Sequence, residues 1–187
     1  MQSLLDNQIN AIAKLKEFKV GALFMEAGTG KTRAAYELVK SVHECDYVLW
    51  LTPFRTKDNL RAELSKWTSA NIRIEGIESL SSSDRLMLNL YQELELAKCP
   101  FIVVDESLKI KNWSAKRTRR IIELGKLSTY KLILNGTPVS RNLLDVWAQM
   151  WFLSPRILNM DMAEFKNTFC EYTKITKRIG HTQYSRE

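Results

Sequence analysis

Residues 27–32 read Ala-Gly-Thr-Gly-Lys-Thr and directly follow a short apolar segment. Glycines let the backbone bend so that several N–H groups face one concavity, and a helix that follows adds its positive end. In such a loop Lys31 reaches the β- and γ-phosphates of a nucleotide, and the Thr32 hydroxyl binds Mg²⁺. The strict GxxxxGK[ST] pattern requires glycine at position 25, where this sequence has Met25. The predicted nucleotide-binding residues of the loop are Gly28, Thr29, Gly30, Lys31 and Thr32.

Two adjacent acidic residues, Asp105 and Glu106, follow a second apolar segment, Phe-Ile-Val-Val at 101–104. A carboxylate at a strand end can hold Mg²⁺ directly or through water, which we expect of Asp105. Glu106 could then orient and deprotonate an attacking water. Together with Lys31, this pair favours hydrolysis of a nucleoside triphosphate over small-molecule kinase chemistry. Glu106 and Lys31 are the predicted catalytic residues, and Thr32 and Asp105 are the predicted metal ligands.

The elements that must position these residues alternate along the chain. Apolar runs predict buried strands at residues 20–25, 47–52, 72–77, 101–104 and 131–134. Apolar residues at helical spacing predict helices near residues 4–15, 34–42, 60–67 and 86–97, and Ser83 is the expected start of the last one. This alternation predicts an α/β fold with a mostly parallel sheet and helices on both faces. Trp147 and Trp151, four residues apart, are expected in the core.

Composition narrows the class of partner. The chain of 187 residues suits one globular domain, with 28 Lys and Arg, 21 Asp and Glu, and a formal charge of +7. Residues 1–100 contain equal numbers of both signs, so the whole surplus lies in residues 101–187. Six basic residues and no acidic residue lie between Lys109 and Arg120. The surplus indicates a polyanionic partner.

The remaining signals are mainly exclusions. Cys45, Cys99 and Cys170 are odd in number and have no CxxC spacing, so free thiols are expected and a zinc site is not. No signal-peptide pattern begins the chain, and no apolar run approaches the ~20 residues of a membrane span. We expect a cytoplasmic or otherwise intracellular protein that is neither secreted nor bound to a membrane.

The motifs together resemble the first RecA-like lobe of superfamily-two helicases, specifically the Swi/Snf-type DNA translocases. The resemblance runs from about residue 4 to residue 158. Its segments are LLDNQ with Gln8, the phosphate loop, residues 48–67, residues 105–112, and residues 132–158 with Gly-Thr-Pro. The Lys-Asn after the acidic pair, and the Trp and Phe-Leu after Gly-Thr-Pro, distinguish this group from DEAD-box RNA helicases.

The resemblance implies a RecA-like P-loop fold in which the strand at 131–134 lies between the strands at 20–25 and 101–104. It implies ATP and Mg²⁺ at the carboxyl ends of the strands, as the general rule for open α/β sheets also expects. Gln8 would recognise adenine, and Gly136 and Thr137 would couple the nucleotide to the rest of the machine.

The sequence departs from the family pattern at several positions. Ser107 and Leu108 stand where the family usually has Ala-His or Ala-Asp, which removes a side chain that often couples nucleotide to nucleic acid. Asn135 stands where many members have Thr, and Arg141 replaces a common Asn. None of these changes removes a phosphate or metal ligand.

The resemblance also implies DNA, in duplex form, as the polyanion. Such lobes hold the nucleic-acid backbone without reading sequence, through the motif around Pro53 and neighbouring loops. The predicted contacts are Pro53, Arg55, Lys57, Lys109, Lys111, Lys116 and Arg120. For the cations between 109 and 120, the alternative is a solvated basic helix face.

Members of this family hydrolyse ATP only when a second lobe, which supplies arginine fingers, closes on the first. No motif of that lobe follows here. We therefore expect a lobe at residues 1–170, a basic tail or the start of a segment toward a second lobe at residues 171–187, and weak or no hydrolysis by the chain alone. The second lobe would act in cis or in trans. The alternatives are an inactive ATP- or DNA-binding module, and a P-loop NTPase that does not act on nucleic acid.

Overall fold

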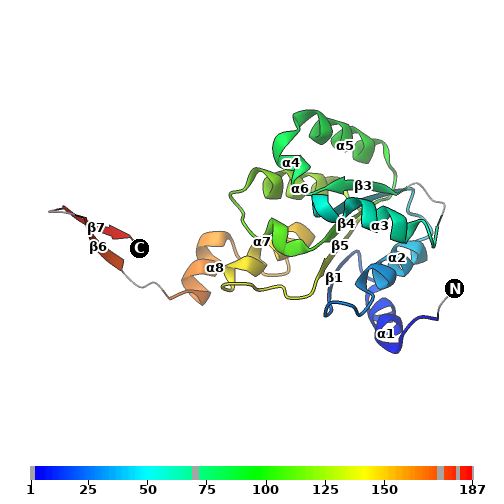
Figure 1. Ribbon diagram of the computed structural model, residues 1–187, viewed down its shortest axis with the longest axis horizontal. Coiled ribbons are helices and arrows are strands. Elements are labelled where there is room, and N and C mark those ends of the chain that lie inside the picture. Colours follow the sequence, from blue (N-terminus) through cyan, green and yellow to red (C-terminus); the bar gives the residue numbers. More distant parts are fainter. Residues whose placement is uncertain (1–2, 69–71, 172–174, 180–181, 187) are drawn as a thin grey trace.

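The structure, a computed structural model, describes residues 3–68, 72–171, 175–179 and 182–186 (Figure 1). Its centre is a five-stranded sheet with the order β1-β5-β4-β2-β3, in which every neighbouring pair is parallel. The strands are β1 (Val20–Phe24), β2 (Tyr47–Thr52), β3 (Arg73–Gly76), β4 (Pro100–Asp105) and β5 (Tyr130–Asn135). The predicted parallel sheet is confirmed, and β5 lies between β1 and β4 as the family resemblance implied.

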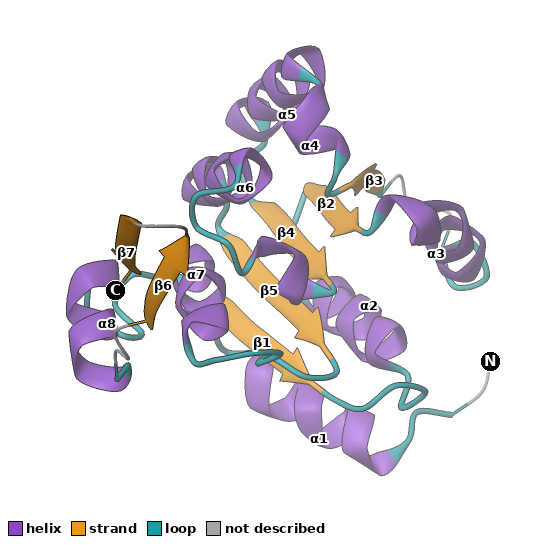
Figure 2. Cartoon of the chain, turned by 60° about the vertical axis from the view of Figure 1, so that its left-hand side comes forward, coloured by secondary structure: helices purple, strands orange, loops and turns teal. Residues whose placement is uncertain are grey.

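Helices cover both faces of this sheet (Figure 2). One face packs on α1 (Asp6–Leu15), α2 (Lys31–Ser41) and α3 (Lys57–Leu64). The other packs on α4 (Ser79–Ser82), α5 (Asp84–Leu96), α6 (Lys116–Leu127) and α7 (Leu144–Leu153). The Ser83 hydroxyl accepts a hydrogen bond from the Leu86 N–H at 3.1 Å, which confirms the predicted start of α5.

The central strands show why their sequences are continuously apolar. In β2, Leu49 and Leu51 enter one core cluster while Trp50, between them, enters the other, and all three are fully buried. A strand with helices on both faces needs apolar residues at every position, so it loses the polar alternation of a one-sided sheet. The predicted limits of β2 coincide with the observed ones, and those of the other strands differ by at most one residue at each end.

Beyond α7 lie α8 (Met162–Phe169) and an antiparallel pair, β6 (Ile175–Ile179) and β7 (Thr182–Arg186). Parts of the predicted tail, at residues 172–174, 180–181 and 187, lie outside the described residues. Trp147 is buried and Trp151 stacks on it with ring centroids 4.7 Å apart, so the predicted packing role is confirmed. The three cysteines are free.

Parallel strands bring their following loops to a single edge of the sheet. The segments after β1 (residues 25–30), β2 (53–56), β4 (106–111) and β5 (136–143) therefore share the carboxyl edge. Within the described part of the chain, no helix is long and apolar enough to cross a membrane.

Candidate nucleotide and nucleic-acid site

The loop between β1 and α2 has the geometry of a phosphate cradle. Gly28 and Gly30 adopt φ angles of 80° and 76°, in the left-handed region that glycine tolerates best. Gly30 also caps α2, so the N–H groups of the first helical turn remain free of helix partners. A Cβ placed on Gly28 would meet no heavy atom within 4 Å, so this side of the loop is open. The loop therefore presents N–H donors and the positive end of a helix to an accessible space.

Lys31 is held across the same loop. Its Nζ donates to the carbonyl oxygens of Met25 at 2.9 Å and Glu26 at 3.1 Å. Met25 itself donates its N–H to the Asn135 carbonyl at 3.0 Å, which extends the β1–β5 pairing by one residue. The position where the strict motif has glycine thus continues the sheet, and the tight turn begins after it.

Gln8 links α1 to the phosphate loop. The side chain is buried, and its Nε2 donates to the carbonyls of Thr29 at 3.1 Å and Gly30 at 3.3 Å. Its Oε1 accepts from the Leu5 N–H at 3.0 Å. Gln8 therefore anchors the loop backbone as well as lying at the place where a nucleobase is expected.

A cavity of about 620 Å³ opens beside Gln8 and the glycines of the loop. Arg33 and Trp67 also line this cavity, and the Arg33 guanidinium lies 4.7 Å from the Trp67 ring centroid. Glu37 holds the same guanidinium by an ion pair of 2.6 Å. Sequence reasoning missed both residues as pocket walls, because Arg33 and Trp67 are brought together from two separate helical regions.

Asp105 ends β4 in a largely buried position. Burial, and then the neighbouring negative charge of Glu106, raise the pKa of Asp105 to about 6. The Glu106 N–H at 3.0 Å, the Thr52 hydroxyl at 3.4 Å and the charge of Lys31 partly oppose this rise. The ionised Asp105 carboxylate is therefore unfavourable here unless a cation neutralises it, as expected of a group that binds a cation.

Glu106 is exposed and has φ of 52° and ψ of 56°, the left-handed region that non-glycine residues rarely adopt. Such strain costs roughly 1–3 kcal/mol and persists only where the surroundings impose it. Glu106 starts the 3₁₀ turn η2 (Ser107–Ile110) directly after the strand β4. Asp105 and Glu106 thus differ in backbone conformation, and the Asp105 carboxylate lies inward while the Glu106 carboxylate lies at the surface.

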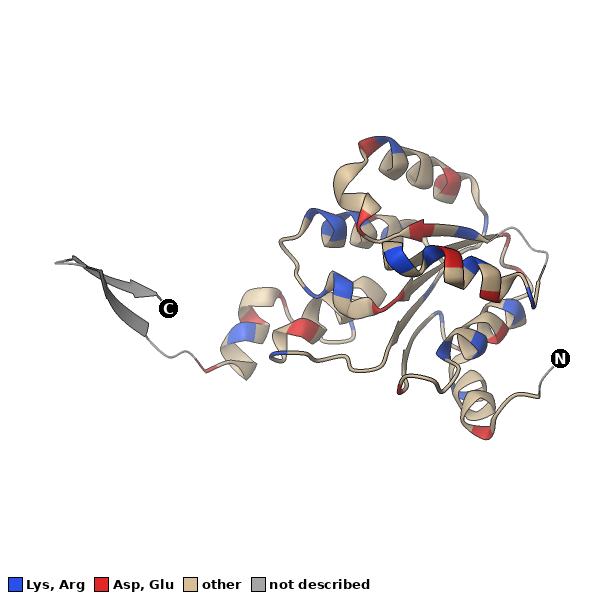
Figure 3. Cartoon of the chain, in the orientation of Figure 1, with Lys and Arg blue, Asp and Glu red and all other residues tan. Residues whose placement is uncertain are grey.

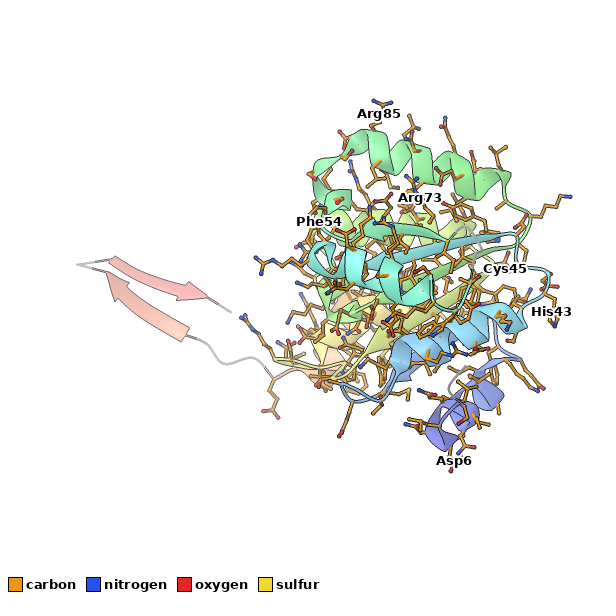
Figure 4. All side chains as sticks on the ribbon, turned by 45° about the vertical axis from the view of Figure 1, so that its right-hand side comes forward. Asp6, His43, Cys45, Phe54, Arg73 and Arg85 are labelled. Atoms are coloured by element: carbon orange, nitrogen blue, oxygen red, sulfur yellow. The ribbon has the colours of Figure 1, made fainter. Side chains whose placement is uncertain are left out.

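The turn after β2 carries the first predicted nucleic-acid residues. Pro53 precedes η1 (Phe54–Thr56), and its carbonyl accepts from the Thr56 N–H at 2.9 Å. Phe54, labelled in Figure 4, is 62% exposed. Arg55 is exposed and has no ion-pair partner among the described residues. Lys57, by contrast, is paired with Glu75 at 2.7 Å.

The basic run at 109–120 is tied into the lobe through acidic partners. Lys109 lies 3.5 Å from Glu78, in an exposed pair. Lys111 donates to the Ser140 hydroxyl at 2.5 Å and lies 3.3 Å from Asp145. The carboxylate of Asp84 pairs with both remaining predicted contacts, Lys116 at 3.0 Å and Arg120. In the cartoon of Figure 3, basic and acidic positions are accordingly interspersed along the elements of the lobe.

Comparison with known proteins now decides the family. A family model described as SNF2-related domain matches residues 7–184. The chain belongs to this family. Its sheet and motifs are those of a RecA-like, helicase-like lobe of the Swi/Snf type.

Individual relatives agree with this assignment. The chromatin structure-remodeling complex subunit snf21 of Schizosaccharomyces pombe is 28% identical over 181 residues, which cover 85% of this chain and 14% of that protein. The ISWI chromatin-remodeling complex ATPase ISW2 of Saccharomyces cerevisiae is 29% identical, with coverage of 80% and 15%. Among solved structures, the Sulfolobus solfataricus SWI2/SNF2 ATPase core in complex with dsDNA matches with a TM-score of 0.72 and 26% identity, covering 90% of this chain and 39% of that one. This SNF2-related lobe thus spans a small part of its curated relatives.

Two departures of this SNF2-related lobe from the family pattern lie in contact with each other. Ser107 is fully buried, donates its hydroxyl to Gln149 Oε1 at 2.5 Å and accepts from Asn135 Nδ2 at 3.4 Å. Gln149 Nε2 in turn donates to the Pro138 carbonyl at 2.8 Å. A buried hydrogen-bond network therefore joins the acidic pair to the loop that contains Gly136 and Thr137. Sequence reasoning missed Gln149, which lies 42 residues from Ser107.

The donor set of the SNF2-related lobe fits a nucleoside triphosphate with Mg²⁺. The ammonium of Lys31, the helix N-terminal N–H groups and the open side of Gly28 suit phosphates. The hydroxyl of Thr32 and the carboxylate of Asp105 are oxygen ligands of the type Mg²⁺ prefers. When bound, Mg²⁺ would neutralise charge on the phosphates. Thr52, whose hydroxyl lies 3.4 Å from Asp105, is a further positioning residue that the sequence did not reveal.

Proposed function

We propose that this chain is the ATP-binding lobe of a translocase ATPase that double-stranded DNA stimulates. A second RecA-like lobe, in cis or in trans, would complete the active site. The observation that carries the proposal is the meeting of three loops at one sheet edge: the cradle around Lys31, the Asp105–Glu106 pair, and the Gly136 loop between them. The SNF2-related family and its ATPase relatives support it.

The proposed roles follow from position. Lys31 would bind the β- and γ-phosphates and Glu106 would activate water. Thr32 and Asp105 would hold Mg²⁺. Gln8 would contact adenine from the wall of the 620 Å³ cavity. Gly28, Thr29 and Gly30 would contact the phosphates, and Gly136 and Thr137 would couple the nucleotide to the rest of the machine.

For DNA, we propose backbone contacts through the turn at Pro53, through Arg55, which has no ion-pair partner among the described residues, and through Lys109, whose 3.5 Å pair with Glu78 is exposed. Support comes from their place at the carboxyl edge and from the relative that was solved with dsDNA. The other predicted cations would reach DNA only by leaving their acidic partners; they are Lys57, Lys111, Lys116 and Arg120. We propose an intracellular location because relatives are named as chromatin-remodeling proteins, with no preference for the cytoplasm.

The nucleotide part is tested by Lys31→Ala and Lys40→Ala, compared by calorimetric titration with ATP and Mg²⁺. Lys31→Ala should abolish measurable binding, because the loop loses its phosphate-facing cation. Lys40, exposed at the far end of the same helix, is the matched control and should leave the affinity unchanged. Equal affinities in the two variants would contradict a phosphate-binding loop.

The need for a second lobe is tested by phosphate release with and without duplex DNA. The chain alone should bind ATP and turn it over barely above background, since an arginine finger contributes about 10³–10⁵ in rate in related phosphoryl-transfer sites. Light scattering must establish the oligomeric state in the same sample. Robust, DNA-stimulated turnover by a monomer would show that the lobe is sufficient.

A further inference from the structure

A second cavity, of about 410 Å³, lies away from the phosphate loop. Its walls come from three separate segments: residues 111–114 after η2, residues 141–145 at the start of α7, and helix α8. The sequence analysis named Lys111 as a DNA contact, the Lys-Asn pair as a family motif and Arg141 as a departure from it, but it did not predict that these residues line one cavity. Cationic and amide side chains of the wall belong to Lys111, Asn112, Arg141, Asn142 and Lys166.

Two of these cations are free to meet a ligand. The side chains of Arg141 and Lys166 make no ion pair or hydrogen bond with any residue the structure describes. Arg141 is exposed, and its backbone N–H, not its side chain, donates to Asp145 at 2.9 Å. Lys166 is half-buried in the last turns of α8. The two charges reach the cavity from elements that are separated in sequence.

The two asparagines of the wall offer donors rather than acceptors. Asn112 Oδ1 accepts from the N–H of Ser114 at 3.0 Å and from its hydroxyl at 2.8 Å. Asn142 Oδ1 accepts from the Leu144 N–H at 3.1 Å. Because these local bonds fix each amide with its oxygen toward the backbone, each NH₂ group remains for a ligand.

The one carboxylate of the cavity wall is already satisfied. Asp145 accepts from Lys111, from the N–H and hydroxyl of Ser140, and from the Arg141 N–H, at distances of 2.8–3.3 Å. Its charge therefore neutralises Lys111 and leaves Arg141 and Lys166 uncompensated. A cavity with two free cations and two amide donors is complementary to an anion.

We propose that this cavity binds a backbone phosphate of DNA, with Arg141 and Lys166 as charge partners and Asn112 and Asn142 as hydrogen-bond donors. The inference rests on the proposed function. Trp113, Leu144 and Met162 add an apolar wall beside these donors. A phosphodiester carries a sugar that can pack on this wall, so it suits the cavity better than a bare carboxylate does. Glu78 accepts from the Phe54 N–H at 2.8 Å and lies 3.5 Å from Lys109, and Lys111 ends the turn that carries Lys109. The cavity therefore extends the proposed DNA surface from the turn at Pro53 toward α8.

The experiment measures the affinity of the whole chain for a fluorescent DNA duplex as a function of salt. In Arg141→Ala/Lys166→Ala, the log-log slope should fall by about 1, because the one phosphate that both cations neutralise loses its partners. The control, Lys16→Ala/Lys40→Ala, removes the same charge from two exposed positions, one directly after α1 and one on α2, and should keep the slope. Arg141→Ala retains the backbone N–H that Asp145 requires, so the fold should persist.

A second variant tests the donors without removing a cation. Asn112→Asp/Asn142→Asp keeps the oxygens that cap Ser114 and Leu144 but converts each NH₂ donor into a charged acceptor. We expect about tenfold weaker DNA binding or more at fixed salt, since each lost donor becomes a repulsive group. The affinity for ATP with Mg²⁺ should remain that of the unaltered chain in all variants.

The outcomes separate this inference from the proposed function. If the unaltered chain binds DNA and Arg141→Ala/Lys166→Ala retains its slope, the cavity is not a DNA site and the proposed function stands. If the unaltered chain binds ATP with Mg²⁺ but no duplex, the DNA part of both fails together. If polyglutamate displaces the duplex as effectively as unlabelled duplex does, the cavity recognises carboxylates of an acidic protein instead, and the proposal is overturned.

Discussion

The basic run at 109–120 and the cavity beside α8 use the same residue types in opposite ways. In the run, Lys111, Lys116 and Arg120 are each matched by a carboxylate of the lobe. In the cavity, Arg141 and Lys166 have no such partner among the described residues. The first group joins segments 30 or more residues apart, whereas the second leaves its charge for an external anion.

This difference shows that the number of basic residues in a stretch of sequence does not tell how many of them are available to an external anion. Asp84 and Asp145 lie far from the run in sequence, so a count over residues 109–120 cannot include them. A cation held by a buried carboxylate must break that pair before it can contact DNA, which leaves an uncompensated charge. Free cations pay no such cost, so they should dominate the salt dependence of binding.

The largest expected effect is on the paired side of this comparison. Asp145→Ala should lower the free energy of unfolding by about 3–5 kcal/mol, because it strands Lys111 and three further donors around a buried position. Urea denaturation of the two proteins measures it. The control is Asp84→Ala, whose carboxylate is 79% exposed and should matter far less. Equal losses would mean that burial does not set the strength of these pairs.

Arg120 should be the next most sensitive position. Its Nη1 donates to the carbonyls of Leu80 at 2.9 Å and Ser83 at 3.2 Å, so it joins α6 to the α4–α5 turn. Arg120→Ala should cost about 2 kcal/mol of unfolding free energy, since charged donors are lost at partly buried acceptors. The salt slope of DNA binding should not change. A lower slope with unaltered stability would move Arg120 to the group of free cations.

The pH dependence of the unfolding free energy tests the Asp145 carboxylate without truncating its side chain. Burial would raise the pKa of Asp145, but the N–H groups of Ser140 and Arg141, with the Ser140 hydroxyl and Lys111, lower it to about 2. Its unfolded pKa is about 3.9, so the stabilisation is complete above that value and is lost as pH falls toward 2. The unfolding free energies of the unaltered chain and Asp145→Asn should therefore converge by on the order of 2 kcal/mol between about pH 5 and pH 2. A constant difference would show that the ionised form is not the stabilising one.

The parts that could be predicted from sequence are those with a local cause. Gly28 and Gly30 signal a left-handed turn, Ser83 signals a helix start, and continuous apolar runs such as 101–104 signal strands buried on both faces. Each signal is contained within a few neighbouring residues. The place of β5 between β1 and β4 came from the family resemblance, because no local pattern encodes which strand neighbours which.

The parts that could not be predicted depend on pairing across the chain. The Ser107 hydroxyl meets Gln149 only because η2 and α7 pack together, and the Lys111–Asp145 pair depends on the same packing. The cavity needs α8 to place Lys166 opposite Arg141. A single sequence carries no periodicity or spacing for such contacts. The predicted DNA residues were therefore selected by charge and by the family resemblance, without knowledge of their partners.

The smallest expected change in stability, and the finest test of the comparison, uses two cations in one turn. Arg55 has no ion-pair partner in the part of the chain that the structure describes, while Lys57, two residues later, is bound to Glu75 at 2.7 Å. Arg55→Ala should lower the salt slope of DNA binding by about 1 and leave the unfolding free energy within about 0.5 kcal/mol. Lys57→Ala should keep the slope and cost about 1 kcal/mol, because Glu75 retains only Arg73 at 3.0 Å. If both variants lower the slope equally, ion pairing within the lobe does not keep a cation from DNA, and the separation of paired from free cations fails at its most closely matched positions.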